Sequence, residues 1–313
     1  MRDIVLGVDV GGTTTDFGFV NRSGEVLEEY SLITHELKDP TAMIQAIWRQ
    51  TSDSGFLDRL LGIGIGAPNG NFFTGKIEFA PNLIWKGIIP LADMFHQQFG
   101  VEAVLTNDAN AAALGEMLYG NARDLKDFVT ITLGTGLGSG VIVNGELVYG
   151  HDGFAGEYGH IRVIPHGRKC GCGRLGCLET YVSATGVIRS ITEYDNSSKS
   201  GSSLLSLEKP HAEDVFQAAQ DGDQFAIDII DYTSEVLGSS LADFACFSSP
   251  KAYVLFGGIA QSGQEFADKV KIHLEQHILN IYKNKIEIRI SSLHEINAAV
   301  LGAASLIWKK HAI

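Results

Sequence analysis

One pattern of strands and turns occurs twice in this chain and constrains its fold more than any other feature. Residues 4–30 and 128–149 share one order: an apolar strand, a turn rich in Gly and Thr, a second strand, a hairpin turn and a third strand. Any β-meander has this order, but both first turns also have a composition suited to holding phosphate. A duplicated unit predicts two similar lobes, each directing a loop into one central cleft. The expected strands are 4–10, 15–20, 25–34, 128–133, 141–143 and 146–149.

The rest of the chain alternates strand and helix signals, which is typical of α/β lobes. Helices are expected over 39–50, near 91–99, from Asn107 onward and over 296–309, and strands over 60–66, 103–106, 252–256 and 286–291. A polar insert at 196–203 is expected to be a surface loop without chemistry. The length of 313 residues also favours two domains, since about 150 residues is usual for one.

Charge and hydropathy exclude several classes of protein. The chain has 24 basic and 37 acidic side chains and a formal charge of -13, which disfavours a surface for nucleic acid or anionic membrane. No apolar run reaches the ~18 residues of a membrane span, and the N-terminal strand lacks the cleavage site of a secretory signal. We therefore expect a soluble cytoplasmic protein.

Both glycine-rich turns contain the residue types that bind phosphate. Asp9-Val10-Gly11-Gly12-Thr13 follows the first strand, and Gly134-Thr135-Gly136 opens a turn predicted over 134–140. Glycines expose backbone N–H groups, hydroxyls donate hydrogen bonds, and a carboxylate can hold Mg²⁺. A hairpin that needs glycine for its dihedral angles is the alternative, but two such loops favour a polyphosphate held from both lobes. Neither is a P-loop or a dinucleotide fingerprint, since no Gly-Lys-Ser/Thr follows and each turn leads to a strand.

Asn107-Asp108-Ala109-Asn110 lies where a strand ends and a helix begins. Asn or Asp at this place is a common helix N-cap, and position alone favours that interpretation. A carboxylate in the first helical turn also stays ionised in the helix dipole field, so it can accept a proton from a substrate hydroxyl. The two interpretations are compatible.

The cysteines indicate a metal site. His160, Cys170, Cys172 and Cys177 are followed or separated by glycines that let the chain fold tightly around a small ion. Three thiolates and one imidazole form a closed tetrahedral Zn²⁺ site with no open position, so we expect a structural ion; three free thiols are the alternative. Cys246, between apolar residues, is expected to be a buried core thiol.

Two acidic residues flank this cluster. Glu157 precedes Tyr158-Gly159-His160, and Glu179 follows Cys177 by two residues. They are either solvated loop carboxylates or carboxylates that a stiffened loop holds toward neighbouring sugar hydroxyls. The sequence alone leaves both interpretations open.

Taken together, these motifs resemble those of the ROK sugar kinases (repressor, open reading frame, kinase), a branch of the two-lobed actin-like and hexokinase-like ATPase fold. The resemblance covers nearly the whole chain. The matching segments are Asp9–Thr13, Asn107–Asn110, Gly134–Gly136, Gly156–His160, Cys170–Glu179 and Phe256–Gly258.

The resemblance implies an α/β fold with a duplicated ββαβ-type core and a central cleft. It implies an N-terminal lobe of residues 1–120 joined by the C-terminal helix 297–313. The other lobe, 121–296, then carries the zinc loop and the adenosine site. Relatives in this family are often homodimers, so the resemblance also implies that state.

The resemblance implies a role for each matching residue, with ATP, Mg²⁺ and structural Zn²⁺ as cofactors. Asp108 is then the catalytic base for the 6-hydroxyl of a hexose. The sugar ligands are Asn82, Asn107, Asp108, Glu157, His160 and Glu179; the Mg²⁺ and phosphate contacts are Asp9, Gly11, Gly12, Thr13, Thr135 and Gly136; Gly257 and Gly258 border the adenosine.

Two departures from the family pattern affect these roles. Many members have Gly-x-Pro-Gly where this chain has Gly66-Ala67-Pro68-Asn69, which leaves the backbone contacts of that loop open. Members also often carry Lys or Arg beside the first phosphate loop, where this chain has Thr13-Thr14-Thr15-Asp16. Neutralisation of the phosphates then depends more on Mg²⁺ and backbone dipoles.

The predicted function is a glucokinase of carbohydrate metabolism and glycolysis, because the stretch 177–186 is more similar to glucokinases than to N-acetylmannosamine kinases. Kinases of N-acetylmannosamine, N-acetylglucosamine or fructose are the alternatives. A sugar-responsive repressor of the same family is disfavoured because Ile4 already lies in the first strand and the charge is acidic. A silent sugar-binding module is disfavoured because Asp9 and Asp108 are both present.

Overall fold

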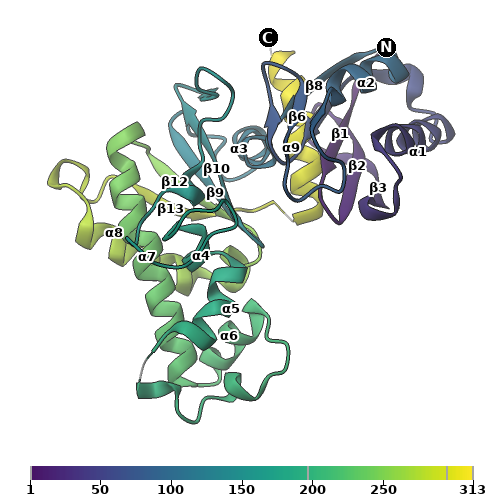
Figure 1. Ribbon diagram of the computed structural model, residues 1–313. Helices are drawn as coiled ribbons and strands as arrows, with labels where there is room; N and C mark the ends of the chain where they lie inside the picture. Colours follow the sequence, from purple (N-terminus) through teal and green to yellow (C-terminus); the bar gives the residue numbers. More distant parts are fainter. Residues whose placement is uncertain (1, 196, 294, 312–313) are drawn as a thin grey trace.

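Two mixed five-stranded sheets form the framework of the molecule (Figure 1). The computed structural model describes residues 2–195, 197–293 and 295–311. The strand orders are β3-β2-β1-β4-β8 in the first sheet and β11-β10-β9-β12-β13 in the second. In each sheet the central strand is the one that comes first along the chain. It pairs antiparallel with the second strand along the chain and parallel with the fourth. The α/β class and the predicted duplication are therefore confirmed.

The repeated unit is longer than the expected ββαβ core. Each copy has three consecutive antiparallel strands followed by two parallel strands. The first sheet consists of β1 (Ile4–Val10), β2 (Thr14–Asn21), β3 (Val26–Ile33), β4 (Leu60–Gly66) and β8 (Glu102–Thr106). The second consists of β9 (Phe128–Leu133), β10 (Leu137–Val143), β11 (Glu146–Leu147), β12 (Ala252–Phe256) and β13 (Glu287–Ile290).

The glycine-rich turn of the second unit is shorter than predicted. The expected turn over 134–140 followed by a strand at 141–143 is wrong, since β10 begins at Leu137, opposite Leu133. Gly138 and Gly140 lie within the strand. Glycine is needed at both positions because helix α3 (Asp108–Leu118) packs closely on the strand. A Cβ atom would lie 2.7 Å from Ala109 at the first position and 2.6 Å from Ala113 at the second. The third strand of this unit also ends at Leu147 rather than at 149.

The last helix returns to the first sheet. α9 (Glu295–Lys310) lies against the β1 and β2 strands, where Val5 and Val20 pack with Val300 and Leu301 (Figure 1). Glycines permit this contact, because a Cβ on Gly7 would overlap the carbonyl oxygen of Val300. The predicted helix over 296–309 is confirmed to within one residue at each end.

The chain passes from one sheet to the other after α3 and back again after β13. A buried carboxylate is hydrogen-bonded to both of these connecting segments. Glu116, fully buried near the end of α3, accepts hydrogen bonds from Ser291 Oγ and from the backbone N–H of Asn121 at 2.8 Å. The Asn121 side chain in turn donates to the Ile290 carbonyl at 2.6 Å. Burial raises the pKa of Glu116, while these hydrogen bonds oppose the rise.

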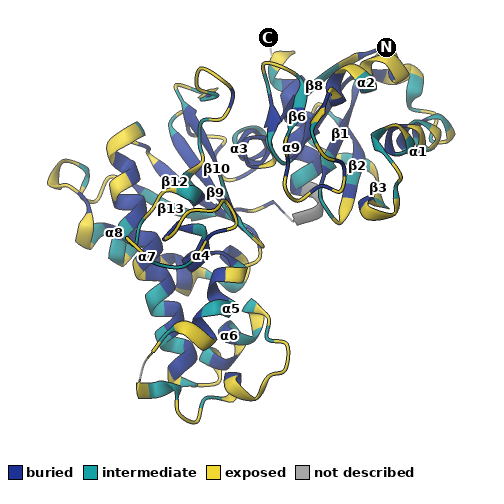
Figure 2. Cartoon of the chain, in the orientation of Figure 1, coloured by how far each residue is buried: buried dark blue, intermediate teal, exposed yellow. Residues whose placement is uncertain are grey.

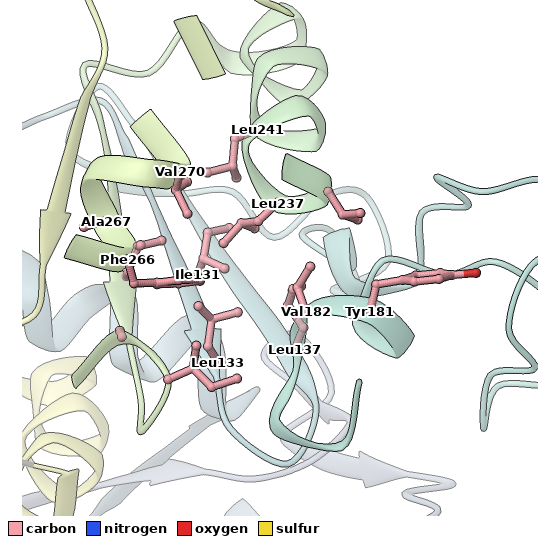
Figure 3. Packing of buried hydrophobic residues seen from close by; sticks show 14 of the residues in the cluster. Ile131, Leu133, Leu137, Tyr181, Val182, Leu237, Leu241, Phe266, Ala267 and Val270 are labelled. Atoms are coloured by element: carbon pink, nitrogen blue, oxygen red, sulfur yellow. The ribbon is translucent and has the colours of Figure 1, made fainter. Parts of the chain in front are cut away.

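The remaining helices complete the apolar cores, some packing against the sheets and others against neighbouring helices (Figure 2). They are α1 (Pro40–Asp53), α2 (Leu91–Phe99), α4 (Glu179–Val182), α5 (Ala184–Glu193), α6 (Ala212–Gln220), α7 (Gln224–Ser248) and α8 (Gln264–His277). Figure 3 shows the core of the second unit, where Ile131 of β9 packs with Leu237 of α7 and Val270 of α8. In the described part of the chain, no helix is both long and apolar enough to cross a bilayer.

The expectation that Cys246 is a buried core thiol is wrong. Cys246 and Phe247 are exposed near the end of α7, whereas Phe244 and Ala245 are buried. A helix turns by about 100° per residue, so one narrow apolar stripe faces the core and the next two positions rotate away from it.

Two regions contain structure that the sequence patterns did not predict. A small antiparallel sheet of β5 (Gly70–Asn71), β6 (Lys76–Glu78) and β7 (Ile88–Ile89) precedes α2. The polar insert contains the short 3-10 turns Ser197–Lys199 and Ser203–Ser206; its residue 196 lies outside the described residues. Asp223 anchors it by accepting hydrogen bonds from Ser202 and Ser203.

Candidate active site

A cavity of about 650 Å³ lies where the two glycine turns and the N-terminus of α3 meet. This volume falls within the range of about 300–1,000 Å³ that is usual for small-molecule sites. The cavity brings together nearly all the residues singled out from the sequence. Those lining it are Asp9, Gly11, Gly12, Asn82, Asn107, Asp108, Thr135, Gly136, Glu157, His160, Glu179, Gly257 and Gly258.

Asp108 lies in the first turn of α3, directly after the N-cap residue Asn107. The Asn107 Oδ1 atom accepts from the N–H groups of Ala109 at 2.9 Å and Asn110 at 3.4 Å, which confirms the cap. The NH₂ group of the Asn107 side chain is thus left available to a ligand. Asp108 Oδ1 also accepts from the Ala109 N–H at 2.8 Å. Burial raises the pKa of Asp108, and this hydrogen bond opposes the rise.

Asp9 is the last polar residue of β1 and lies close to Asp108. Burial raises the pKa of Asp9 to about 8, and the neighbouring carboxylates of Asp108 and Asp16 add to the rise. Asp16 stands opposite Asp9 in the register of β1 and β2. Gly66 leaves room for this group, since a Cβ there would lie 3.1 Å from Asp9 Oδ1. Within the described residues Asp9 has no ion-pair partner. Oxygen ligands of this kind fit Mg²⁺.

The first glycine turn contacts the loop that carries Asn82. A Cβ on Gly12 would overlap the Asn82 carbonyl oxygen, so glycine is required there by a neighbouring loop as well as by any ligand. Gly11 is equally restricted, because a Cβ would lie 2.7 Å from the Thr14 carbonyl oxygen. Thr13 does not line the cavity; its carbonyl accepts a hydrogen bond from the Thr34 N–H at 2.8 Å.

The second glycine turn separates this cavity from a larger one of about 1,090 Å³. Gly134, Thr135 and Gly258 line both cavities, so a long ligand can extend from one into the other past the turn. Gly257 has a φ of +98°, and a Cβ there would lie 2.7 Å from the Leu133 carbonyl. Among the described residues that line either cavity, none is Lys or Arg.

Glu157 and Glu179 approach the same cavity from the second unit. Burial raises the pKa of Glu157, the nearby His160 opposes this, and Asp108 and Glu179 contribute to the rise. The Glu179 Oε2 atom accepts from the Leu137 N–H at 3.0 Å, at the end of the second glycine turn. Both carboxylates line the cavity; Glu157 is also exposed to solvent, and Glu179 is half-buried.

His160, Cys170, Cys172 and Cys177 form one cluster, with ligand atoms all within 4.8 Å of one another. The Sγ atoms of Cys172 and Cys177 lie 3.7 Å apart, and Cys170 Sγ lies 3.7 Å from His160 Nδ1. Tetrahedral Zn²⁺ with bonds of about 2.3 Å to sulfur and about 2.0 Å to nitrogen places its ligands about 3.5–3.8 Å apart, so the donor set fits this ion. His160 Nδ1 points to the cluster while the residue also lines the cavity, so its ring belongs to both.

Several lining residues were not predicted, and Asn69 is the most informative. Its φ of +52° lies in the left-handed region that Asn tolerates. Its side chain donates to the Glu78 carbonyl at 3.0 Å, so the loop keeps a turn that glycine would also permit. Asn110 has a buried Oδ1 atom without a hydrogen-bond partner among the described residues. The other unpredicted lining residues include Asp16, Pro68, Thr132, Ser139, Gly153, Phe154, Ala155 and Ala299.

This arrangement suits transfer of a charged group to a polar acceptor. A carboxylate at a helix N-terminus faces the cavity, two turns offer backbone N–H groups, and the adjoining cavity has room for a nucleoside. The acidic lining without Lys or Arg requires a cation to accompany any phosphate.

Comparison with known proteins gives consistent matches over the whole chain. The model of the ROK family matches residues 5–310. A glucokinase of Halalkalibacterium halodurans is 37% identical over 96% of this chain and 94% of that protein. A xylose repressor of Caldicellulosiruptor bescii is 30% identical over 97% of this chain and 77% of that protein. The crystal structure of a ROK glucokinase from Streptomyces griseus in complex with glucose and AMPPNP has a TM-score of 0.79, 32% identity, and coverage of 97% of this chain and 98% of that one.

Proposed function

This chain belongs to the ROK family, and we propose that it is an ATP-dependent glucokinase that phosphorylates the 6-hydroxyl of glucose. One observation carries the proposal: Asp108, Asp9 and both glycine turns line a single cavity. The glucokinases among its relatives and the structural similarity to a glucokinase with bound glucose and AMPPNP support the same activity.

Asp108 is the proposed catalytic base. It accepts the proton of the sugar 6-hydroxyl as the oxygen attacks the γ-phosphorus and the bond to the ADP leaving group breaks. The Ala109 N–H holds Oδ1 of this carboxylate, which restricts the side chain to one orientation toward the cavity. Orientation of this kind contributes to catalysis because the base need not be ordered during the reaction.

The proposed sugar ligands surround Asp108 from both units. Asn82 and the free amide of Asn107 come from the first, whereas Glu157, His160 and Glu179 come from the second. Carboxylates accept pairs of hydroxyl hydrogen bonds, while amides and imidazole donate or accept as needed. Closure of the two lobes on the sugar then removes water from the reacting atoms.

The phosphates of ATP are proposed to lie along both glycine turns, with contacts from Gly11, Gly12, Thr135 and Gly136, which line the cavity, and from Thr13, which lies beside it. The adenosine then occupies the larger cavity beyond Thr135; Gly258 lines both cavities, and Gly257 lines the smaller one beside it. Asp9 is the proposed carboxylate for Mg²⁺, which would supply the positive charge that this lining lacks.

His160, Cys170, Cys172 and Cys177 are proposed to hold Zn²⁺ in a closed site. Four protein ligands leave no position for a reacting atom, so the ion's part is to fix the loop that carries Glu157 and Glu179.

The lobes that close are proposed to be residues 1–120 with the C-terminal helix 297–313, and residues 121–296. The packing of α9 on β1 and β2 supports the first of these units. We further propose that the enzyme acts as a cytoplasmic homodimer in glycolysis.

Phosphorylation assays with glucose, mannose, fructose, N-acetylglucosamine and N-acetylmannosamine test the proposal. Glucose should give the highest kcat/KM with ATP, and the Asp108→Asn variant should lower kcat by at least ~10²-fold at unchanged protein fold. A higher kcat/KM for an N-acetylhexosamine or fructose would replace glucose as the substrate. Absence of turnover with every sugar would refute the kinase assignment.

A further inference from the structure

We propose that Arg168 is a positioning residue for the ATP site, although it lies in the cysteine loop and lines neither cavity. The proposal rests on the proposed function and goes beyond it, because the cysteine loop is otherwise linked only to the sugar. Its basis is a continuous set of hydrogen bonds from Arg168 through helices α4 and α5 to the second glycine turn.

Arg168 is a buried cation that four groups of α4 and α5 satisfy. Its side chain is 9% exposed. One guanidinium nitrogen donates to the carbonyl oxygens of Thr180 at 2.8 Å and Gly186 at 3.0 Å. The others contact Ser190 Oγ at 2.9 Å and a Glu193 carboxylate oxygen at 2.8 Å. A planar fork with five N–H donors suits this set, whereas a lysine ammonium does not.

Tyr181 makes a second attachment at the same place. Its hydroxyl accepts from the Arg168 backbone N–H at 2.7 Å, and its ring lies 4.7 Å from the guanidinium carbon. In Figure 3 this ring extends away from the other labelled core side chains, with the hydroxyl at its far end. The start of the cysteine loop is therefore fixed to α4 and α5 by one residue, through both its backbone and its side chain.

Helices α4 and α5 also contact the second glycine turn and the residue that follows it, at Gly134, Thr135 and Leu137. The Ala184 N–H donates to the Gly134 carbonyl at 2.9 Å, and Thr185 Oγ1 donates to the Thr135 carbonyl at 2.7 Å. The Leu137 N–H donates to Glu179 Oε2 at 3.0 Å. These residues belong to α4, α5, the turn and the first position of β10.

This placement makes α4 and α5 a rigid connection between Arg168 and the turn proposed to bind phosphate. A packed core transmits a displacement of such an element, because it has little free volume in which to relax. Weakening the Arg168 contacts should therefore shift Ala184 and Thr185 and with them the carbonyls of the turn. The expected effect is a weaker binding of nucleotide, in addition to any effect on the sugar.

The first test measures nucleotide binding without sugar. Arg168→Lys keeps the positive charge beside Glu193 but loses most of the fork, and it should raise the Kd for Mg²⁺·AMPPNP about 5- to 10-fold in titration calorimetry. The control is Arg59→Lys: Arg59 forms an exposed ion pair with Asp3 just before strands β4 and β1, and the change should leave that Kd unchanged. Circular dichroism establishes that each variant is folded at the temperature used, and metal analysis establishes that each retains its zinc.

The second test approaches the same connection from the other end. Thr185→Val keeps the shape of the side chain and removes the hydrogen bond to Thr135, so it should raise the same Kd about 3-fold or more. If Arg168 acts through α5, the double variant should show less than the product of the two separate effects. This arm remains informative if Arg168→Lys folds poorly.

The outcomes separate this proposal from the proposed function. A Kd within 2-fold of the wild type in both single variants, or fully multiplicative effects in the double variant, would overturn the role of Arg168. A wild-type protein that binds Mg²⁺·AMPPNP but phosphorylates no hexose would instead overturn the function. A raised Kd in both single variants with a non-multiplicative double variant supports the proposal, whichever sugar is the substrate.

Discussion

Replacement of Asp108 by Asn is the perturbation that most directly tests the chemistry of this site. The change keeps the size of the side chain and keeps an oxygen that can accept from the Ala109 N–H. Asn107 makes the helix cap by itself, so α3 should begin at the same residue in the variant. What is lost is the negative charge that receives a proton from the sugar hydroxyl.

The magnitude follows from this separation of roles. General-base catalysis typically contributes about 10²- to 10⁴-fold, or about 3–5 kcal/mol of barrier. Since the cap and the Oδ1 contact remain, we expect kcat to fall by at least ~10²-fold with only a modest change in the KM for glucose. The surface variant Asp93→Asn on α2 removes one exposed carboxylate and should behave as the wild type.

The pH dependence of kcat provides a second measurement on the same variants. A base acts only when ionised, so kcat falls as the pH drops through its pKa. Burial raises the pKa of Asp108, and the decline should therefore begin at a higher pH than the ordinary aspartate value of about 3.9 would give. This acidic limb should be absent from whatever residual activity Asp108→Asn retains.

Near-normal turnover of Asp108→Asn in a coupled ADP-release assay would refute the assignment of the base. A kcat loss matched by an equal loss of glucose binding would refute the reasoning in another way, because it would make Asp108 chiefly a ligand. If the residual kcat of Asp108→Asn declined at the same acidic pH as the wild-type kcat, the titration would belong to another group.

Three further perturbations test other parts of the structure. Cys172→Ser should lose its bound zinc, measured by metal analysis, and raise the KM for glucose, because the cluster fixes the loop of the sugar ligands; wild-type KM in the zinc-free protein would contradict that. Gly12→Ala introduces a Cβ that overlaps the Asn82 carbonyl oxygen, so the KM for glucose should rise about 10-fold, and unchanged kinetics would show that this loop yields freely. Glu116→Ala leaves Ser291 without its buried acceptor and should lower the free energy of unfolding by about 2–4 kcal/mol in urea titrations. If the unfolding midpoint and slope equalled those of the wild type, Glu116 would not stabilise the two segments that connect the sheets.

Much of the fold was predictable because the repeated pattern is local. Each strand of the duplicated unit has its own apolar run and its own turn residues, and Asn144-Gly145 indicates a hairpin without any tertiary information. The length of the second glycine turn was not predictable in the same way. Gly138 and Gly140 are required by the approach of α3, which comes from an earlier part of the chain, so turn composition alone gave the wrong boundary.

The candidate site shows the same division. Gly12 and the Asp9 carboxylate belong to recognisable short motifs, and these residues line the cavity. Phe154 has no distinctive local pattern, and Asn110, although it ends the Asn107–Asn110 motif, carries no signal in the sequence that its side chain would line the cavity. Arg168 contacts residues of α4 and α5 that lie 12 to 25 positions further along the chain, and no periodic pattern in the sequence predicts these contacts.

The proposed nucleotide site has Asp and Glu in its lining and, among the described residues, no Lys or Arg, so it should discriminate between the ionic forms of its substrate. These carboxylates would repel an uncomplexed triphosphate, whereas a bound divalent cation would cancel much of the phosphate charge. Free nucleotide should consequently be a feeble competitor for the chelated form. The rate of such an enzyme inside a cell should then depend on the concentration of divalent cations as closely as on the concentration of ATP.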